Sequence, residues 1–255
     1  MPEGLEAEIY REAAVAFVGS QLTAVEVDSA CGDPAALSML IGSTVLAARR
    51  HGKQVLLDTT NGVLGMHFGM TGRLIVDGAA PIDRLQYGAR RDDPRWDRLI
   101  VRASHRTMRV NDPRRWSRYV IDPDTSKLGV DLLAATRDIR TALHAVAHRS
   151  APMKAVLLDQ SVVAGIGNLI ADEVCFVAGY DPRRPFSSLD RDGRAALATV
   201  MAKVARRLRR LGGSHMGATG PAIRSVGASC PLDGTPFVRG EVAGRTTLWC
   251  PVHQR

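Results

Sequence analysis

The sequence predicts an α+β fold with an N-terminal antiparallel β-sandwich behind a leading helix, then a helical domain that ends in a small β-ribbon. Three observations predict it. Apolar residues recur at helical spacing over residues 3–18, and short alternating runs separated by turn residues follow as far as about residue 124. Longer helical patterns then take over, and the last residues, 229–255, are turn-rich and carry two cysteines.

The leading helix is indicated by Leu5, Ile9, Ala13 and Phe17, and Gly19 ends it. The runs that follow are four to six residues long, which is typical of the strands of a sandwich or barrel. The predicted strands are Leu22–Val27, Thr44–Ala48, Gln54–Asp58, Gly62–His67, Gly72–Val76, Arg98–Ala103 and Met108–Asn111, with Tyr119–Pro123 closing the set.

The second half is predicted to be mainly helical. Its expected helices are Thr136–Ala147, Pro152–Leu158, Asn168–Ala178 and Leu189–Leu211, and the glycine-rich stretch Gly212–Gly220 is expected to be a loop. We therefore expect a β-sandwich domain over residues 1–124, a linker over 125–135, a helical domain over 136–226 and a β-hairpin over 227–255.

Charge and composition narrow the class of function. The chain of 255 residues has a net charge of +8 and a pI near 9.8, which favours a polyanionic partner such as nucleic acid, although a merely basic protein has the same charge. No run of 18 apolar residues indicates a membrane span, and the N-terminus lacks the basic and apolar regions of a secretory signal. The four cysteines do not suggest an oxidising compartment, so we expect a cytoplasmic protein.

The N-terminus offers a candidate nucleophile. Removal of Met1 would leave Pro2 with a secondary α-amine, and an α-amino pKa of about 7.7–8.0 leaves such a group partly neutral at physiological pH. Its adduct with an aldehyde is a cationic iminium, an electron sink suited to β-elimination. Glu3 beside it is placed to carry protons. The same residues also fit an ordinary helix start, with proline followed by glutamate.

Four further segments carry candidate functional residues. Lys53 lies in a basic turn before an apolar strand, and Met70, Arg114 and Trp116 lie in two turn-like segments, His67–Gly72 and Asn111–Trp116. Leu157–Asn168 joins two helices through glycines, so that the second helix begins near Asn168, where backbone N–H groups can bind a phosphate. On their own, these segments have ordinary explanations, which are a solvated lysine, core apolar residues and a plain helical hairpin.

The C-terminal ribbon has the spacing of a metal site. Cys230 and Asp233 form one pair at i, i+3, and Cys250 and His253 form another. Two such pairs around a hairpin are typical of a zinc ribbon, and cysteine, aspartate and histidine all ligate zinc. The alternative is a metal-free ribbon held by the packing of Phe237, Leu248 and Trp249.

Taken together, the motifs resemble the formamidopyrimidine-DNA glycosylase / endonuclease VIII family of bifunctional DNA glycosylases. The resemblance lies in Met-Pro-Glu-Gly-x-Glu at the N-terminus, Gly-Lys-x-x-Leu-Leu at Lys53, His-x-Gly-Met-x-Gly, Asp-Pro-Arg-Arg with an aromatic residue, and Leu-Leu-Asp-Gln with Gly-x-Gly-Asn. It covers nearly the whole chain, in order. Leu5 stands where the family usually has proline, and Trp116 where it has phenylalanine.

The resemblance assigns roles to these residues. It implies Pro2 as the nucleophile, Glu3 as the proton carrier and Lys53 as a phosphate contact that aids proton transfer. It implies that Met70, Arg114 and Trp116 fill the gap left by a flipped base, a step that glycosylases need to reach their target. Glu6, Lys154, Asn168 and Arg245 complete the expected DNA-binding set, and the family's finger implies structural zinc and no organic cofactor.

The expected activity is therefore base excision from damaged double-stranded DNA with β,δ-elimination, by a monomer associated with the nucleoid. A catalytically silent or lyase-only DNA-damage-binding protein of the same fold is the alternative, and a basic zinc-ribbon RNA-binding protein is a further one. The segment between Gly213 and Cys230 is short and lacks the family's Tyr-Gly-Arg turn, so 8-oxoguanine is not the expected substrate. Oxidised pyrimidines, ring-opened purines and other bulky lesions remain open.

Overall fold

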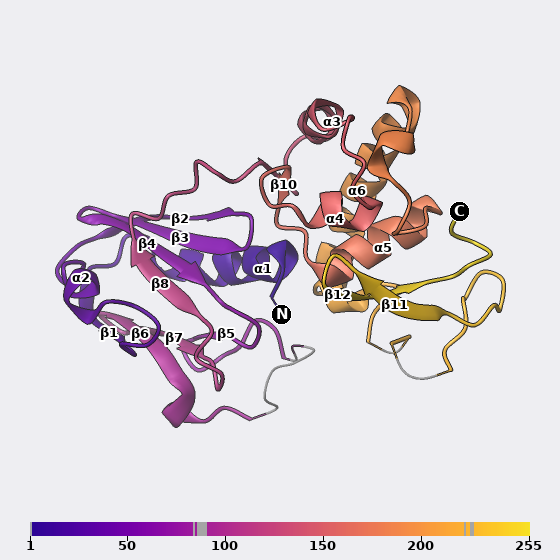
Figure 1. Ribbon diagram of the computed structural model, residues 1–255. Helices are drawn as coiled ribbons and strands as arrows, with labels where there is room; N and C mark the ends of the chain where they lie inside the picture. The colour runs from indigo at the N-terminus through magenta and orange to yellow at the C-terminus, as the bar shows by residue number, and fades with distance from the viewer. Residues whose placement is uncertain (1, 84, 86–90, 222, 225–226) are drawn as a thin grey trace. The chain divides into compact units, whose positions relative to one another are not determined.

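The chain divides into two compact units, Met1–Thr125 and Ser126–Arg255, in the computed structural model (Figure 1). The structure describes residues 2–83, 85, 91–221, 223–224 and 227–255. Each unit has its own hydrophobic interior and is described by itself below.

The N-terminal unit begins with helix α1 (Gly4–Ala14) and the short 3₁₀ helix η1 (Val15–Phe17). A reciprocal capping box between Glu3 and Glu6 begins α1, because each side chain accepts a hydrogen bond from the other residue's backbone N–H. Tyr10 and Phe17 are fully buried from these helices, and Gly19, with φ of 84°, turns the chain into the first strand.

Two four-stranded antiparallel sheets follow, as the sequence predicts (Figure 1). The first, in spatial order, consists of β1 (Leu22–Val27), β6 (Asp97–Ala103), β7 (Arg106–Asn111) and β5 (Arg73–Val76). The second consists of β2 (Val45–His51), β3 (Gln54–Thr59), β4 (Gly62–His67) and β8 (Arg118–Ile121). Side chains from both sheets and from α1 form one buried cluster, so the two sheets and the helix share a core.

Two short helices in this unit are absent from the sequence prediction. Helix α2 (Pro34–Ser38) begins because the Asp33 carboxylate accepts from Ala35 N–H at 2.9 Å and Pro34 is preset for a first turn. The 3₁₀ helix η2 (Pro94–Trp96) begins in the same way, with Asp93 accepting from Arg95 N–H at 3.1 Å. Both are too short to give a periodic pattern.

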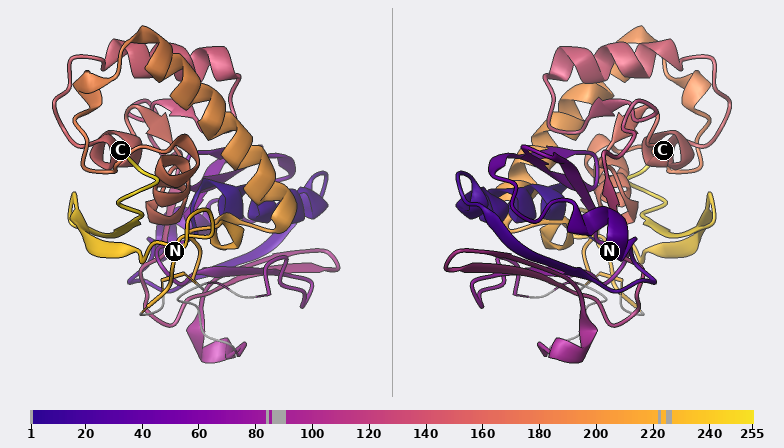
Figure 2. Two further views of the ribbon diagram at one scale, coloured as in Figure 1. Left: turned by 90° about the vertical axis from the view of Figure 1, so that its right-hand side faces the viewer. Right: turned by 90° about the vertical axis from the view of Figure 1, so that its left-hand side faces the viewer.

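The C-terminal unit contains α3 (Thr136–Ala145), α4 (Met153–Leu158), α5 (Asn168–Ala178) and the long α6 (Arg191–Leu211), which Figure 2 shows in orange. The 3₁₀ helices are η3 (Phe186–Ser188) and η4 (Ser214–Met216), and β11 (Val238–Val242) pairs with β12 (Arg245–Trp249) as an antiparallel hairpin. Helix α5 packs against α4, α6 and β12, and this places it at the centre of the unit.

Residues 125–135, expected to be a linker, contain strand β9 (Val130–Asp131), which pairs in parallel with β10 (Val163–Ala164). The chain is held there because Gly129 N–H donates to the Gln160 carbonyl at 2.8 Å. A Cβ at Gly129 would come within 2.4 Å of the Ser161 carbonyl oxygen, so only glycine fits. The α+β class is confirmed, and no helix among the described residues is long and apolar enough to span a membrane.

Candidate functional site

The capping box fixes the backbone directly after Pro2. Glu3 N–H donates to Glu6 Oε2 at 2.8 Å, and both glutamate side chains are buried. Glu6, expected to contact DNA, therefore has a second role that the sequence pattern also contains, as the third residue of the cap. Met1 lies outside the described residues. The start of α1 thus fixes the backbone at Glu3, directly after the candidate nucleophile Pro2.

Lys53 lies at the tip of the β2–β3 hairpin. His51 pairs with Gln54, so Gly52 and Lys53 form a two-residue turn, with φ of 59° at Gly52. Arg50 Nη1 donates to the Gly52 carbonyl at 2.7 Å, and Arg50 Nε lies 3.0 Å from Glu8 Oε2 on α1. The lysine turn is therefore tied to the same helix that carries Pro2 and Glu3 at its start.

His67 lies beside this turn and was not singled out as a functional residue in the sequence. It pairs with Gln54 across β3 and β4, and its Nδ1 accepts from Gly69 N–H at 3.2 Å. Burial, together with the positive charges of Lys53 and Arg118, lowers the pKa of His67 below its usual 6.5. The ring is therefore neutral at pH 7 with its proton on Nε2, where it can donate to an anion.

The candidate void-filling side chains lie on two loops of the same unit. Trp116 is 50% exposed, Arg114 is exposed and Met70 is half-buried. The Arg114 guanidinium carbon lies 5.4 Å from the centre of the Trp116 ring, within range of a cation–π contact. An exposed tryptophan next to an exposed arginine suits insertion into a base stack better than it suits core packing.

The turn between α4 and α5 is stapled by one side chain. Gln160 donates through Nε2 to the carbonyls of Leu158 and Ile166 at 2.8 and 2.9 Å, and its Oε1 accepts from Gly165 N–H at 3.1 Å. Asn168 is the first residue of α5, after Gly167 as N-cap. The Leu-Leu-Asp-Gln motif thus fixes the position at which the helix carrying Asn168 begins.

Lys154 is predicted to contact DNA, and the structure places its side chain away from solvent. Its side chain is fully buried, with Nζ 2.7 Å from Asp172 Oδ1, 2.7 Å from Thr247 Oγ1 and 3.2 Å from the Thr246 carbonyl. Arg224 pairs with the same carboxylate of Asp172. A buried aspartate one helix away supplies the counter-charge, so the lysine joins α4 to α5 and to the ribbon and does not face solvent.

The Thr246 carbonyl also accepts from Asn168 Nδ2 at 3.1 Å. Arg245, the preceding residue, is exposed at the start of β12, directly after a two-residue turn with φ of 52° at Ala243 and 69° at Gly244. Positive φ at both turn residues is the pattern of a type I′ hairpin. Two candidate DNA contacts, Asn168 and Arg245, are therefore held next to each other by one backbone carbonyl.

A second buried carboxylate holds the segment after α6. Glu173 accepts from the N–H groups of Ala218 and Thr219 at 3.0 and 2.9 Å and from Thr219 Oγ1 at 3.0 Å. A Cβ at Gly217 would lie 2.5 Å from Glu173 Oε2, which explains the glycine. The expectation that this segment is too short to cover 8-oxoguanine falls partly on residues 222, 225 and 226, which lie outside the described residues.

The ribbon brings three of the four expected metal ligands together. Metal-ligating atoms of Cys230, Asp233 and Cys250 all lie within 4.8 Å of one another. The predicted fourth ligand, His253, is not among them: its Nε2 is 2.7 Å from the Phe176 carbonyl, and its ring packs 4.9 Å from that of Phe176. Two thiols and a carboxylate at this spacing suit a zinc ion on three sides, and structural zinc takes four ligands.

The candidate residues thus fall into two sets, one in each unit. The N-terminal unit carries Pro2, Glu3, Glu6, Lys53, Met70, Arg114 and Trp116, and the C-terminal unit carries Lys154, Asn168, Arg245, Cys230, Asp233, Cys250 and His253. Within each set, hydrogen bonds hold the turns and loops that carry the exposed candidate residues.

Two family models and several curated proteins match this chain over most of its length. Residues 1–119 match the formamidopyrimidine-DNA glycosylase N-terminal domain, and residues 128–218 match the formamidopyrimidine-DNA glycosylase H2TH domain. Formamidopyrimidine-DNA glycosylase of Variovorax paradoxus is 30% identical with all of both chains covered, and that of Moorella thermoacetica is 33% identical over 87% of this chain and 79% of that one.

Solved structures have the same fold as this chain. The MutM (Fpg) protein from Thermus thermophilus matches with a TM-score of 0.81 and 30% identity, covering 99% of this chain and 98% of that one. Lactococcus lactis Fpg bound to DNA containing N7-benzyl-Fapy-dG matches with a TM-score of 0.81 over the whole of both chains, and at 22% identity it supports the fold alone. The two matched domains together cover most of the residues, and the chain belongs to the formamidopyrimidine-DNA glycosylase family.

Proposed function

We propose that this chain excises damaged bases from double-stranded DNA and then cleaves the abasic site by β,δ-elimination, using the secondary amine of Pro2. The chain is a DNA glycosylase by family, and its relatives include Fpg structures in complex with Fapy-dG and with abasic-site DNA. The observation that supports the lyase chemistry best is the start of α1, where the Glu3–Glu6 capping box fixes the backbone next to Pro2.

The proposed chemistry proceeds in steps whose bonds balance. The neutral Pro2 amine attacks C1′ of the flipped nucleotide, the N–C1′ bond forms as the bond from C1′ to the base breaks, and the proton lost by the amine balances the one taken up by the departing base. Glu3 then delivers a proton to O4′, so the C1′–O4′ bond breaks and the sugar ring opens to a cationic iminium. The resulting iminium withdraws electrons, so loss of a C2′ proton expels the 3′ phosphate, and a second elimination expels the 5′ phosphate. Water then hydrolyses the imine and frees Pro2.

Lys53 is proposed to bind the phosphate of the flipped nucleotide and to help move protons. Its positive charge also disfavours protonation of a nearby amine, because like charges repel. His67, with its proton on Nε2, is placed beside the same turn to donate to that phosphate. Asn168 and Arg245 are proposed as the phosphate contacts of the C-terminal unit.

The ribbon is proposed to hold structural zinc through Cys230, Asp233 and Cys250, whose donor atoms lie close enough together for one ion. Zinc there would cross-link the two ends of the hairpin and hold Arg245 at its tip. The proposed location is the cytoplasm, together with the chromosome.

Borohydride trapping tests the mechanism. Wild type with a free Pro2 is incubated with a duplex that carries one abasic site and is compared with Pro2→Gly, Glu3→Gln and a form with an N-terminal extension. We expect a covalent complex with wild type and none with the extended form, since the extension removes the terminal amine.

Loss of trapping in the extended form while DNA affinity is kept supports the proposal. The absence of a trapped complex from folded, DNA-binding wild type would overturn it in favour of a silent damage-binding protein. Trapping without release of a formamidopyrimidine, an oxidised pyrimidine or any other base from a lesion panel would indicate a lyase-only enzyme.

A further inference from the structure

One carboxylate lies beneath both loops that carry the candidate void-filling side chains. Asp112 is fully buried, and its Oδ2 accepts from the N–H groups of Trp116 and Ser117, both at 2.8 Å. Its Oδ1 accepts from Arg114 N–H at 3.1 Å and from the hydroxyl of Thr71. Asp112 therefore fixes the backbone of the Arg114–Trp116 loop and, through Thr71, the loop that carries Met70.

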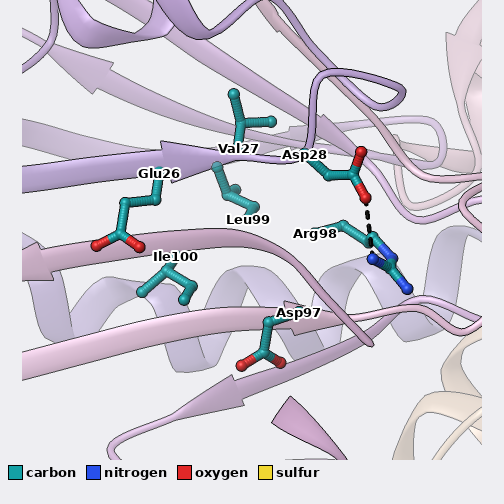
Figure 3. Close-up of a pocket in the computed structure, with 7 residues that line it drawn as sticks. All are labelled: Glu26, Val27, Asp28, Asp97, Arg98, Leu99 and Ile100. Carbon is teal, nitrogen blue, oxygen red and sulfur yellow. Dashed lines mark hydrogen bonds and ion pairs between the residues drawn. The ribbon is translucent and has the colours of Figure 1, made fainter. Parts of the chain in front are cut away.

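The backbone on the far side of Asp112 is fixed as well. Arg98 Nε donates to the Asp112 carbonyl at 2.9 Å, and Arg98 Nη1 lies 2.9 Å from Asp28 Oδ2, the pair joined by the dashed line in Figure 3. Arg115 Nε lies 2.9 Å from the same Asp28 oxygen. Although burial alone would raise it, the pKa of Asp28 is held below its usual value by Ala30 N–H and the two guanidinium groups.

The two loops also touch backbone to backbone. Gly69 has a φ of 57°, and a Cβ there would lie 2.5 Å from the Trp116 carbonyl carbon. Arg115, between Arg114 and Trp116, has a φ of 56°, a conformation that side-chain-bearing residues rarely adopt. Such a strained residue persists only where its surroundings hold it, and the hydrogen bonds to Asp112 do so on both sides of it.

We propose that Asp112 is a positioning residue, with Thr71 as the joint, that makes the Met70 loop and the Arg114–Trp116 loop one rigid wedge for insertion beside the flipped base. The inference rests on the proposed function, because the wedge matters only if a base leaves the stack. Asp112 is fully buried, so in this proposal it acts through the two loops and not through a contact of its own with DNA.

A rigid wedge has a clear benefit for base flipping. Flipping a base costs the free energy of unstacking it, and insertion must fill the gap that the base leaves. Loops that are already in the inserting conformation lose little conformational freedom on binding, whereas independently mobile loops would be ordered at the moment of insertion. Breaking the joint should therefore weaken flipping while leaving the chemistry at C1′ intact.

The first test needs no DNA. In Asp112→Asn the volume is kept, but one of the two oxygens becomes an NH₂ group that cannot accept a hydrogen bond. The NH₂ group must face either the Arg114 N–H or the N–H groups of Trp116 and Ser117, so we expect amide hydrogen exchange of one of these two sets to accelerate about tenfold or more, since each buried N–H without an acceptor costs about that factor. Amides of Leu74 and Val110, paired in the sheet behind, should keep their protection.

Thr71→Val and Thr71→Ser form the matched pair for the joint. Valine removes only the hydroxyl that reaches Asp112, whereas serine keeps it. We expect excision of a formamidopyrimidine from a duplex to fall about tenfold in Asp112→Asn and Thr71→Val and to stay at the wild-type rate in Thr71→Ser. Borohydride trapping on single-stranded DNA with an abasic site should be unchanged in all three, because no base has to be displaced.

The two readouts separate the inference from the proposed function. Unchanged exchange at all three of Arg114, Trp116 and Ser117 in Asp112→Asn, or equal loss of excision and trapping, would overturn the positioning role. If wild type does not trap or excise, the proposed function fails, while the exchange measurement still decides whether Asp112 joins the loops.

Discussion

Arg50 Nε lies 3.0 Å from Glu8 Oε2, and this contact joins the helix that begins at the candidate nucleophile to the strand that ends at the candidate lysine. The Arg50 side chain is 5% exposed, and its Nη1 donates onward to the Gly52 carbonyl. Burial alone would raise the pKa of Glu8, yet Arg11 and Arg50 hold it below its usual value. The Glu8 carboxylate is therefore charged at neutral pH. Through Arg50 it holds α1 and the lysine turn in a fixed position relative to each other.

Arg50→Lys tests this contact. A lysine can keep the ion pair with Glu8 but cannot also donate to the Gly52 carbonyl in the forked geometry of arginine. We expect the free energy of unfolding to fall by about 1 kcal/mol, the value of one such hydrogen bond, and the trapping rate at saturating DNA to fall on the order of tenfold as Lys53 is displaced.

Arg49→Lys is the control, because Arg49 is the neighbouring residue on β2 and its side chain is 55% exposed in a pair with Asp58. Exposed pairs contribute about 0–1 kcal/mol. Equal trapping rates for the two variants would show that the contact with Gly52 does not position Lys53.

A prediction for Lys154 distinguishes a buried structural ion pair from a contact with a DNA phosphate. Replacing it by methionine leaves the Asp172 carboxylate with Arg224 alone, and breaking a buried pair destabilises by about 3–5 kcal/mol. Because Lys154 is fully buried, we expect the slope of log affinity against log salt to stay unchanged in Lys154→Met. Arg245→Gln should reduce that slope by about 1, as loss of one phosphate contact does.

Lys203→Met, on the exposed face of α6, controls for the loss of one positive charge. The measurements are urea denaturation and DNA titrations at several salt concentrations below the melting temperature of the weakest variant. A slope in Lys154→Met reduced as much as in Arg245→Gln would restore Lys154 as a phosphate contact.

The sequence predicts the architecture well because periodicity reports burial. The strands Leu22–Val27 and Gly62–His67 and the helix Asn168–Ala178 have the predicted bounds, since each is limited by glycines or turn residues that the sequence displays. The five-residue helix α2 and the two-residue β9 leave no such signal. Their formation depends on a side-chain cap at Asp33 and on the distant Gln160 carbonyl.

The site was less predictable where a residue's role depends on a distant partner. The side chain of Lys154 contacts Asp172, on the next helix, and the hydroxyl of Thr247. The sequence around Lys154 does not indicate either partner. The spacing of Cys250 and His253 suggests a ligand pair, but the Phe176 carbonyl accepts the histidine proton instead. The assigned roles of Pro2 and Lys53 at the reaction centre stay predictions.

His67 gives a pH dependence whose sign follows from its lowered pKa. The folded state prefers the neutral ring, while the unfolded chain titrates near 6.5, so between the two values the unfolded state binds more protons. The free energy of unfolding therefore has its full His67 contribution above about pH 6.5 and loses it as the pH falls. The loss is at most about 1.4 kcal/mol for each pH unit.

His67→Asn keeps an oxygen that can accept from Gly69 N–H and has no proton to gain, so we expect its stability to fall less between about pH 7.5 and 5.5 than that of wild type. Urea denaturation at each pH is the measurement. Parallel profiles for wild type and His67→Asn would mean that folding does not lower the pKa of His67, and would contradict the prediction.

The ribbon gives the last prediction, which concerns the three donors and the excluded histidine. Purified protein should contain about one zinc per chain, and Cys230→Ser and Cys250→Ser should lose it, because each removes a thiolate from the group within 4.8 Å. His253→Ala should keep the metal, since the His253 Nε2 is occupied by the Phe176 carbonyl at 2.7 Å. Zinc per chain is measured by atomic emission after dialysis, and the DNA affinity of each variant is measured with it.

Because Arg245 lies at the far end of the same hairpin, metal loss should also weaken DNA binding in the cysteine variants and spare it in His253→Ala. Loss of zinc from His253→Ala would show that the ring turns from Phe176 to complete the site, and zinc-free wild type with full DNA affinity would show that packing alone holds the ribbon.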